Sequence, residues 1–313
     1  MLNSLAVVMQ EPLSLAVATL PLDRPTAGDV VVDTLWSGVS AGTERLLFTG
    51  RMPDFPGMGY PLVPGYETVG RVVEAGADTR VPIGAQVFVP GARCFGDVRG
   101  LHGGAASRLV APEARVIRVP EALGERAVML ALAATARHAL SASDAARGAL
   151  IVGHGALGRL VARLAMLAGG EPPVVWEKNP ARAAGAVGYE VTTPEDDPRK
   201  TYPLIIDVSG DAALLDHLVQ RLARGGEVVL AGFYDRVAFA FPPAFMREAR
   251  FRVAAQWGEG DLGEVVRLAE SGALSLEGLI THRAPASAAV EAYRVAFGDP
   301  DCLKMVLDWR AHS

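Results

Sequence analysis

A glycine-rich turn between an apolar run and a helical stretch constrains this chain more than any other feature. The apolar run at residues 149–152 leads into Gly153-His154-Gly155-Ala156-Leu157-Gly158, and a helical pattern follows to residue 168. Strand, glycine turn and helix in this order are the context in which G-x-G-x-x-G predicts a dinucleotide site. Gly153 permits the tight turn, Gly155 lets the backbone approach a pyrophosphate, and Gly158 lets the helix pack close to the strand. The helix N-terminus presents N–H groups and a positive dipole end to that anion. We expect His154 to pack near the cofactor.

A carboxylate stands where a ribose-binding residue is expected. Residues 173–177 form a second short apolar run that ends in Glu177, close to the expected spacing of about 20 residues beyond the glycine turn. A carboxylate there accepts hydrogen bonds from both ribose hydroxyls and repels a 2′-phosphate, which favours NAD over NADP. Lys178 is a neighbouring cation that would tolerate a phosphate. The alternative for Glu177 is an ordinary surface position.

The composition describes a globular chain of two domains. Its 313 residues are 50% hydrophobic and 21% charged, which is enough to bury two cores. A net charge of −5 gives no basic surface for nucleic acid. The two cysteines, Cys94 and Cys302, provide neither a disulfide framework nor a CxxC metal site, and a reducing cytoplasm is the expected compartment. We find no signal peptide and no apolar stretch of about 18 residues, so no transmembrane segment is expected.

The secondary-structure pattern changes near residue 120. Before it, short apolar runs separated by Gly, Pro and Asp predict a β-rich domain with an irregular loop at residues 50–61. Beyond it, strands alternate with helices, which predicts a doubly wound parallel sheet. The predicted strands are 5–9, 30–36, 69–73, 86–89, 115–119, 149–152, 173–177, 204–208, 227–231, 251–255 and 303–307, and the predicted helices are 127–142, 156–168, 212–223, 261–271 and 285–297. The pattern leaves open whether the tail returns to the first domain.

Phrases spread over nearly the whole chain resemble the medium-chain dehydrogenase/reductase superfamily. Residues 64–76 read Pro-Gly-Tyr-Glu-Thr-Val-Gly-Arg-Val-Val-Glu-Ala-Gly where the family has P-G-H-E-x-x-G-x-V-x-x-x-G, and residues 38–44 stand for its G-x-C-G-T-D. Further matching phrases are residues 21–32, 135–140, 225–232, 280–283 and 304–307. The resemblance implies an α/β protein with a GroES-like β-barrel catalytic domain (residues 1–120 and 264–313) and a Rossmann domain (residues 121–263).

The departures from the family pattern concern the catalytic metal. Zinc-dependent members bind zinc through the Cys of G-x-C-G-T-D and the His of P-G-H-E, and these positions here hold Ser40 and Tyr66. Only alanine and leucine stand at residues 131–134, where the third ligand would come, and the four-cysteine lobe is absent. Tetrahedral zinc needs three or four N, S or carboxylate ligands, and only Glu67 remains. We therefore expect a zinc-free enzyme.

Within the superfamily, residues 37–50, 64–67 and 153–158 resemble dehydrogenases of bacteriochlorophyll biosynthesis. That resemblance implies oxidation of the 3-(1-hydroxyethyl) group of a bacteriochlorophyllide-type tetrapyrrole to an acetyl group, with NAD as the hydride acceptor. It also implies a homodimer that pairs the edge strand at residues 251–256. Two alternatives stay open: a zinc-free NAD(P)H-dependent quinone or enone reductase, and a non-catalytic NAD(H)-binding sensor.

Without zinc, a side chain or a water chain must accept the hydroxyl proton of the alcohol. Tyr66 is the first candidate to contact that hydroxyl, although an unperturbed pKa of about 10 makes it a poor base. Glu67 either accepts the proton, directly or through Tyr66, or forms a structural ion pair. Ser40 and Thr43 add hydroxyls near the expected nicotinamide. His102 lies on a glycine-flanked loop. It is a candidate proton relay, a candidate axial ligand to the central magnesium of the pigment substrate, or a solvated loop residue.

In the family, several strand and helix ends face the cofactor. Carried over to this chain, these positions are Thr135, Ser209, Gly210, Ala231 and Gly232, in addition to residues 153–158, Glu177 and Lys178. Asp207 is either another cofactor-side residue or a cap of the following helix. The apolar residues Phe48, Met52, Phe55, Met58 and Tyr60 either form a mouth for a flat macrocycle or pack as a lid.

Overall fold

The computed structural model describes residues 2–54, 56–100, 102–140 and 148–312, and the chain divides into two compact units. The first unit comprises residues 1–131 and 277–313, and the second comprises residues 132–276. The sequence pattern and the family resemblance predict these boundaries at residues 120 and 264. The tail belongs to the first unit, a point that the sequence pattern left open. None of the helices in the described ranges is long and apolar enough to cross a bilayer.

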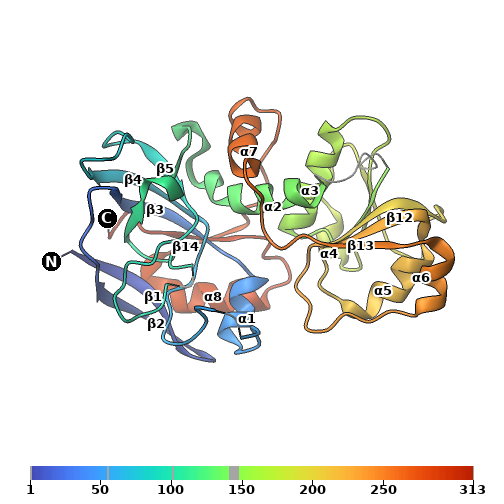
Figure 1. The fold of residues 1–313 in the computed structure, drawn as a ribbon, viewed down its shortest axis with the longest axis horizontal. Coiled ribbons are helices and arrows are strands. Elements are labelled where there is room, and N and C mark those ends of the chain that lie inside the picture. The colour runs from blue at the N-terminus through green and yellow to red at the C-terminus, as the bar shows by residue number, and fades with distance from the viewer. Residues whose placement is uncertain (1, 55, 101, 141–147, 313) are drawn as a thin grey trace. The chain divides into compact units, whose positions relative to one another are not determined.

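The first unit is built mainly on antiparallel β-structure. Its strands are β1 (Asn3–Glu11), β2 (Ser14–Pro21), β3 (Asp29–Val39), β4 (Thr68–Ala75), β5 (Gln86–Val89), β6 (Arg108–Pro112), β7 (Ile117–Arg118), β14 (His282–Pro285) and β15 (Met305–Asp308). β1 and β2 form a hairpin, and the others form a sheet in the order β14-β15-β3-β4-β5-β7 with β6 paired to β3 (Figure 1). The long strand β3 is central because it pairs with β4, β6 and β15.

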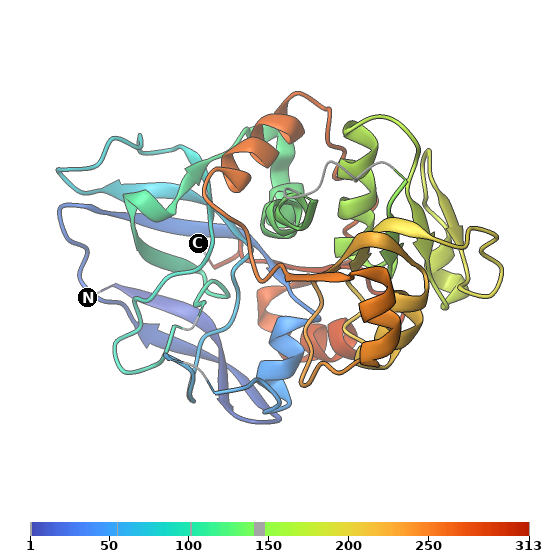
Figure 2. The same cartoon turned by 45° about the vertical axis from the view of Figure 1, so that its right-hand side comes forward.

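The C-terminal strand brings the tail to the end of β3. β15 runs antiparallel to β3 with Met305 opposite Val39, so Lys304 lies beside the last residue of β3 and donates a hydrogen bond to the Val39 carbonyl oxygen. The helix α1 (Thr43–Phe48) starts shortly after β3. The helix α8 (Ala289–Gly298) lies alongside α1 in both Figure 1 and Figure 2.

Two apolar clusters fill the first unit, one around β3, β4 and β5 and the other around α1, α8 and β15. Met52 is only 7% exposed and belongs to the second cluster. Phe48, Met58 and Tyr60 are partly buried against the same cluster. These side chains therefore pack into the core of this unit, as the lid alternative expected. Phe55 lies outside the described residues.

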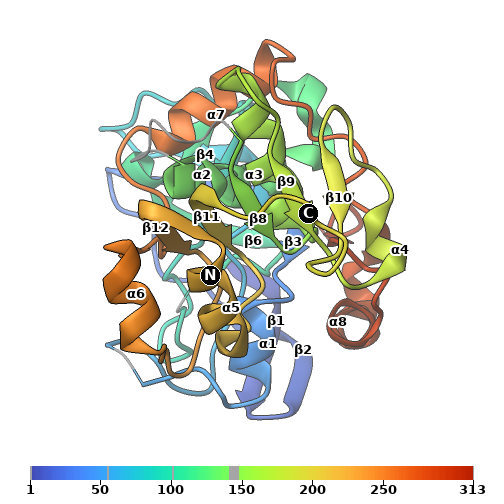
Figure 3. The same cartoon turned by 90° about the vertical axis from the view of Figure 1, so that its right-hand side faces the viewer.

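The second unit contains the doubly wound parallel sheet expected from the sequence. Its strands are β8 (Leu150–Val152), β9 (Val174–Trp176), β10 (Glu190–Thr192), β11 (Tyr202–Asp207), β12 (Leu222–Leu230) and β13 (Arg250–Val253), in the order β10-β9-β8-β11-β12-β13. Its helices include α2 (Leu130–Leu140), α3 (Ala156–Leu167), α4 (Pro180–Ala183), α5 (Leu215–Gln220), α6 (Phe241–Arg247) and α7 (Asp261–Glu270). Figure 3 shows α2 and α3 on one face of the sheet and α5 and α6 on the other. The strand order reverses between β8 and β11, and open α/β sheets bind ligands at such a point.

Some predicted elements differ from the observed ones. The predicted helix 127–142 is helical as α2, but it is preceded by a 3₁₀ segment, η2 (Glu121–Met129), with a break at Gly124, where φ is 52°; residues 141 and 142 lie outside the described ranges. The predicted strand 115–119 retains only β7, because Glu113–Arg115 form a 3₁₀ turn. The pattern also missed β2, β6, β10 and β14. β10 and β14 have 3 and 4 residues and are too short for a two-residue period to be recognised. β2 and β6 do not alternate regularly between buried and exposed residues.

Candidate active site

Three hydroxyl groups meet where β3 ends. The Tyr66 hydroxyl lies 2.6 Å from Ser40 Oγ and 3.3 Å from Thr43 Oγ1. Ser40 follows β3, Thr43 begins α1, and Tyr66 comes shortly before β4, which pairs with β3. Sheet pairing thus joins residues from two separate phrases of the sequence. Burial raises the pKa of Tyr66 above its usual value, and the nearby Glu67 carboxylate raises it further. The phenol therefore stays protonated.

Glu67 forms a buried ion pair with Lys304. Lys304 Nζ donates to Glu67 Oε1 at 2.8 Å and to Oε2 at 2.7 Å. Glu67 is 0% exposed and Lys304 is 3% exposed. The carboxylate occupies space that only a glycine leaves free, because a Cβ atom at Gly38 would stand 2.1 Å from Glu67 Oε2. Two roles are expected for Glu67, proton acceptor or member of a structural ion pair, and these contacts correspond to the ion pair.

A second buried carboxylate, Glu44, lies in the first turn of α1. Its Oε2 accepts a hydrogen bond from the Tyr293 hydroxyl of α8 at 2.6 Å, and its Oε1 accepts one from the Ser40 N–H at 3.0 Å. Burial raises the pKa of Glu44 to about 7, and the hydrogen bonds oppose that shift. The sequence analysis assigned no role to Glu44, Tyr293 or Lys304. Glu44 and Lys304 stand inside family phrases, but their partners lie 249 and 237 positions away along the chain.

The His102 ring stands edge-on to Tyr66. Their ring centroids are 5.0 Å apart and their planes meet at 61°. Burial, together with the positive charges of Arg115 and Arg93, lowers the pKa of His102 to about 4. The imidazole is therefore neutral at physiological pH and accepts through only one ring nitrogen. One of the three roles expected for His102 is that of a solvated loop residue. In the structure His102 is half-buried and lies beside the Tyr66 ring.

The donors gathered here do not fit a tetrahedral zinc ion. The Ser40 and Tyr66 oxygens bond to each other, and Lys304 occupies both oxygens of Glu67. Residues 131–134 are apolar, and among the residues that the structure describes no three His, Cys, Asp or Glu side chains are grouped as metal ligands. Zinc sites need three or four N, S or carboxylate ligands. We derive no catalytic step through a metal ion.

In the second unit, the glycine turn leaves space above the start of α3. Gly153 adopts φ of 104°, and a Cβ atom at Gly158 would stand 1.9 Å from the Gly153 carbonyl oxygen. Gly155 is the N-cap of α3, and a Cβ atom there would meet no atom within 4 Å. The start of α3 therefore has no side-chain cap and open space beside its N-cap residue. This cradle fits a pyrophosphate.

Glu177 directly follows β9 and is held by backbone donors. Its Oε2 accepts from the His154 N–H at 2.9 Å and its Oε1 from the Asn179 N–H at 2.8 Å. The side chain is partly exposed, and Lys178 beside it is exposed. The structure thus brings the glycine turn and the predicted ribose-binding carboxylate into contact.

His154 is fully buried inside the glycine turn. Its Nδ1 lies 2.6 Å from the Arg182 carbonyl oxygen and its Nε2 lies 2.8 Å from the Tyr189 hydroxyl. The imidazole therefore contacts the segment that follows Glu177, a connection that the sequence analysis did not identify. Ala156 and Leu157, the remaining residues of the turn, form the first turn of α3.

The predicted cofactor-side residues after β11 and β12 lie together. A Cβ atom at Gly232 would stand 2.6 Å from the Gly210 nitrogen, so the loops carrying Ser209-Gly210 and Ala231-Gly232 touch. Asp207 Oδ1 accepts from the Ser209 N–H at 2.8 Å and from Ser209 Oγ at 2.6 Å. Asp207 does not cap the following helix, because Asp211 accepts from the Ala213 N–H there. Thr135 is half-buried on α2.

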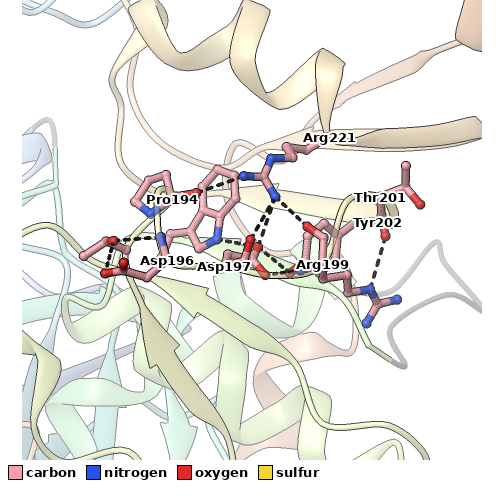
Figure 4. A network of polar contacts seen from close by, with 9 residues as sticks. Pro194, Asp196, Asp197, Arg199, Thr201, Tyr202 and Arg221 are labelled. Carbon is pink, nitrogen blue, oxygen red and sulfur yellow. Dashed lines mark hydrogen bonds and ion pairs between the residues drawn. The ribbon is translucent and has the colours of Figure 1, made fainter.

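A buried polar network supports the strand that carries Glu177. Asp197 is 2% exposed and accepts from Trp176 Nε1 at 2.9 Å and from the Tyr202 hydroxyl at 2.7 Å. Figure 4 shows Arg221 and Arg199 beside Asp197 in this network. Trp176 immediately precedes Glu177, so the network fixes the end of β9. The sequence offered no signal for it, because its members come from separate strands and loops.

Fold and site together define a medium-chain dehydrogenase/reductase. Residues 26–121 match the family described as alcohol dehydrogenase GroES-like domain. A solved alcohol dehydrogenase from Escherichia coli CFT073 complexed with NADH has a TM-score of 0.84 and 20% identity, covering 98% of this chain and 99% of that one. A zinc-binding dehydrogenase from Sinorhizobium meliloti bound to NADP also has a TM-score of 0.84, with 19% identity and coverage of 98% and 100%. At these identities the likeness establishes the fold.

Two curated relatives are much more similar, and both are named 2-desacetyl-2-hydroxyethyl bacteriochlorophyllide A dehydrogenase. The protein from Rhodobacter capsulatus is 58% identical over 97% of this chain and 98% of its own length. The protein from Cereibacter sphaeroides is 56% identical over 99% of each chain. This chain belongs to the family of 2-desacetyl-2-hydroxyethyl bacteriochlorophyllide A dehydrogenases.

Proposed function

We propose that this protein oxidises the 3-(1-hydroxyethyl) group of a bacteriochlorophyllide to an acetyl group, with NAD as oxidant and without zinc. The observation that carries the proposal is the identity of 58% and 56% to two dehydrogenases named for this substrate, over almost the entire chain. In the reaction, the carbinol carbon loses a hydride to the nicotinamide and the oxygen loses a proton to solvent, relayed through the hydroxyl cluster and water, which leaves a C=O bond. The bound nicotinamide supplies the hydride acceptor.

The glycine turn supports a nicotinamide dinucleotide as that acceptor. A Cβ atom at Gly155 would meet nothing within 4 Å, whereas Gly158 packs against the Gly153 carbonyl oxygen. These positions leave the start of α3 open to a diphosphate while its helix stays close to β8. A solved dehydrogenase of the same fold is described with NADH and another with NADP.

Glu177 favours NAD over NADP. Two backbone N–H groups hold its carboxylate at the end of β9, at 2.8 and 2.9 Å. A carboxylate fixed there accepts from ribose hydroxyls and repels a 2′-phosphate. We expect Glu177→Gln to raise the dissociation constant for NAD about tenfold. The ratio of the NADP to the NAD dissociation constant should fall. Glu190→Gln, at an exposed position on the neighbouring strand β10, is the matched control.

In the first unit, Tyr66, Ser40 and Thr43 contact the alcohol. The Tyr66 hydroxyl lies within 3.3 Å of both the Ser40 and the Thr43 hydroxyl, and such groups can donate to and accept from the substrate oxygen. Because the pKa of Tyr66 is raised, Tyr66 acts as a protonated hydrogen-bonding group and not as a phenolate base. The substrate itself eases the reaction, because its carbinol carbon is attached to a conjugated macrocycle that spreads the positive charge developing as the hydride leaves. Zinc in other members of the superfamily assists a different part of the reaction, the loss of the hydroxyl proton.

A homodimer is the proposed assembly, formed through β13. β13 is the last strand of the six-stranded sheet, and Val253 on it is 71% exposed. Beside it, α6 exposes Phe241, Phe245 and Met246 at 68%, 66% and 71%. These residues border an apolar groove of about 500 Å³, which Phe239 and Phe251 also line. Such a patch next to a free strand edge is typical of a protein interface. Cys94 and Cys302 are buried and form no disulfide within the described part of the chain, which fits a reducing compartment such as the cytoplasm.

The test is an absorbance assay with the 3-hydroxyethyl bacteriochlorophyllide and either NAD or NADP. We expect the pigment spectrum to shift to that of the acetyl product as reduced cofactor appears, faster with NAD. The enzyme is first treated with a chelator that is then removed, so that the magnesium of the pigment is untouched. No spectral change with either cofactor would refute the substrate assignment. Loss of activity after chelation, restored by zinc, would refute the zinc-free mechanism.

A further inference from the structure

We infer that His154 is a positioning residue for the cofactor, and that it ties the glycine turn to the segment 177–189 so that Glu177 keeps its place. The inference rests on the proposed function, because it concerns the same dinucleotide site. His154 is a buried polar residue in a turn whose glycine positions require the smallest residue. Its contacts show what that side chain does there.

Both ring nitrogens of His154 reach the segment beyond Glu177. Nδ1 lies 2.6 Å from the carbonyl oxygen of Arg182 in α4, and Nε2 lies 2.8 Å from the hydroxyl of Tyr189, the residue before β10. The His154 and Tyr189 rings meet edge-on at 5.6 Å. One imidazole therefore contacts both the middle and the last residue of the connection between β9 and β10.

The partners define the tautomer. A carbonyl oxygen only accepts, so Nδ1 carries the proton and donates to Arg182. Nε2 then holds the lone pair and accepts from the Tyr189 hydroxyl. Burial lowers the pKa of His154, which keeps this neutral form in place.

The side chain of Arg159, on the helix α3 that follows the glycine turn, makes parallel hydrogen bonds to the same segment. Arg159 of α3 is 6% exposed, and its guanidinium donates to the Arg182 and Ala184 carbonyl oxygens at 3.1 and 2.7 Å. Its Nε also donates to the His154 carbonyl oxygen at 3.1 Å. Gly185 makes room for this guanidinium, because a Cβ atom there would stand 2.3 Å from Arg159 Nη1.

These hydrogen bonds converge on Glu177, whose carboxylate would contact the ribose. The backbone N–H of His154 donates to Glu177 Oε2 at 2.9 Å, while its ring is anchored to Arg182 and Tyr189. Ring and backbone of one residue thus fix the distance between the glycine turn and Glu177. Removal of the ring leaves the peptide free to rotate, deprives the buried Tyr189 hydroxyl of its acceptor, and leaves the Arg182 carbonyl oxygen with the Arg159 hydrogen bond alone.

The experiment measures binding of NADH and NADPH by fluorescence, without any pigment substrate, for the wild type, His154→Ala, His154→Asn and Tyr189→Phe. We expect His154→Ala to raise the dissociation constant for NADH about tenfold and to reduce the ratio of NADPH to NADH dissociation constants. His154→Asn keeps a donor near the Nδ1 position, so it should recover part of the loss. Tyr189→Phe should weaken NADH binding by a smaller factor. In turnover with the pigment, KM for NAD should rise while kcat changes little. His312→Gln, at an exposed position, is the control.

The outcomes separate the two proposals. A wild type that binds neither reduced cofactor would overturn the proposed function and this inference with it. A wild type that binds NADH, together with Tyr189→Phe and His154→Asn variants that fold and keep both its affinity and its cofactor ratio, would overturn this inference alone. The same variants decide the matter if His154→Ala does not fold. A loss of thermal stability with an unchanged ratio would assign His154 to folding and would also reject the positioning role.

Discussion

The ammonium group of Lys304 lies 2.7 and 2.8 Å from the two carboxylate oxygens of Glu67, and both side chains are buried. This pair joins the last strand of the chain to the residue that follows Tyr66. Two charges withdrawn from water are tolerated when each compensates the other. The pair therefore turns a residue that the sequence offered as a proton acceptor into part of the framework beside the hydroxyl cluster.

Removal of one partner of this pair should be costly. Lys304→Met leaves Glu67 buried without a counter-charge, and we expect the free energy of unfolding to fall by about 3–5 kcal/mol. Urea titration at neutral pH measures it. The double variant Glu67→Gln/Lys304→Met should recover most of the loss, whereas the exposed Lys200→Met should change nothing. Equal stability of the Lys304→Met variant and the wild type would contradict the buried pair.

Glu44 should make stability depend on pH. Its folded pKa of about 7 lies above the ordinary value of 4.5, so between these values the folded state binds a proton that the unfolded state has released. Stability should therefore fall as the pH rises from about 4.5 to about 7, by up to about 3 kcal/mol, and then level off.

The measurement is the free energy of unfolding at pH 5 and pH 7.5 for the wild type and Glu44→Gln. Because the amide does not titrate, the difference between the two proteins isolates the contribution of this carboxyl. Glu195→Gln, at an exposed position, serves as control. If the wild type and Glu44→Gln showed the same pH dependence, the raised pKa would be wrong.

Tyr66→Phe tests the hydroxyl cluster. The change removes one oxygen that lies 2.6 Å from Ser40 Oγ and 3.3 Å from Thr43 Oγ1. We expect kcat/KM for the pigment alcohol to fall about 10- to 100-fold, as for the loss of one hydrogen bond in the transition state, with cofactor affinity unchanged. Tyr60→Phe removes a hydroxyl that donates to the Leu47 carbonyl oxygen, and it should leave kcat/KM intact. Full activity of Tyr66→Phe would exclude Tyr66 from contact with the substrate.

The contrast between local and distant pairings explains how much of the site the sequence revealed. The glycine turn, Glu177, and the substitution of Ser40 and Tyr66 at metal-ligand positions are all contained in short phrases, so they were recognisable. The Glu44–Tyr293 and Glu67–Lys304 pairs span 249 and 237 positions, and only the fold brings them together. A single sequence carries no signal for such pairing, because many tyrosines and lysines are equally eligible partners.

The fold follows the same distinction. The alternation after residue 149 predicted a doubly wound sheet because each βα unit is local. The return of β15 to β3 depends on contacts between opposite ends of the chain, so the pattern left it open. The His154 ties were invisible for a related reason, since a G-x-G-x-x-G pattern constrains its glycines and says nothing of the intervening side chain.

The edge strand β13 and the exposed aromatic residues of α6 form the proposed dimer interface. If two copies pair through β13, the aromatic face of α6 is covered in the dimer, and a charge placed there must be desolvated. Phe245→Glu changes a side chain that is 66% exposed in one chain, so it should cost little in folding but shift the protein from dimer to monomer in sedimentation velocity. Leu167→Glu is the control, because Leu167 is also exposed, at 46%, but lies on α3. A wild type that sediments as a monomer at micromolar concentration would remove the dimer. A Phe245→Glu variant that remains dimeric would place the interface elsewhere. In either case the apolar groove beside α6 would need another occupant.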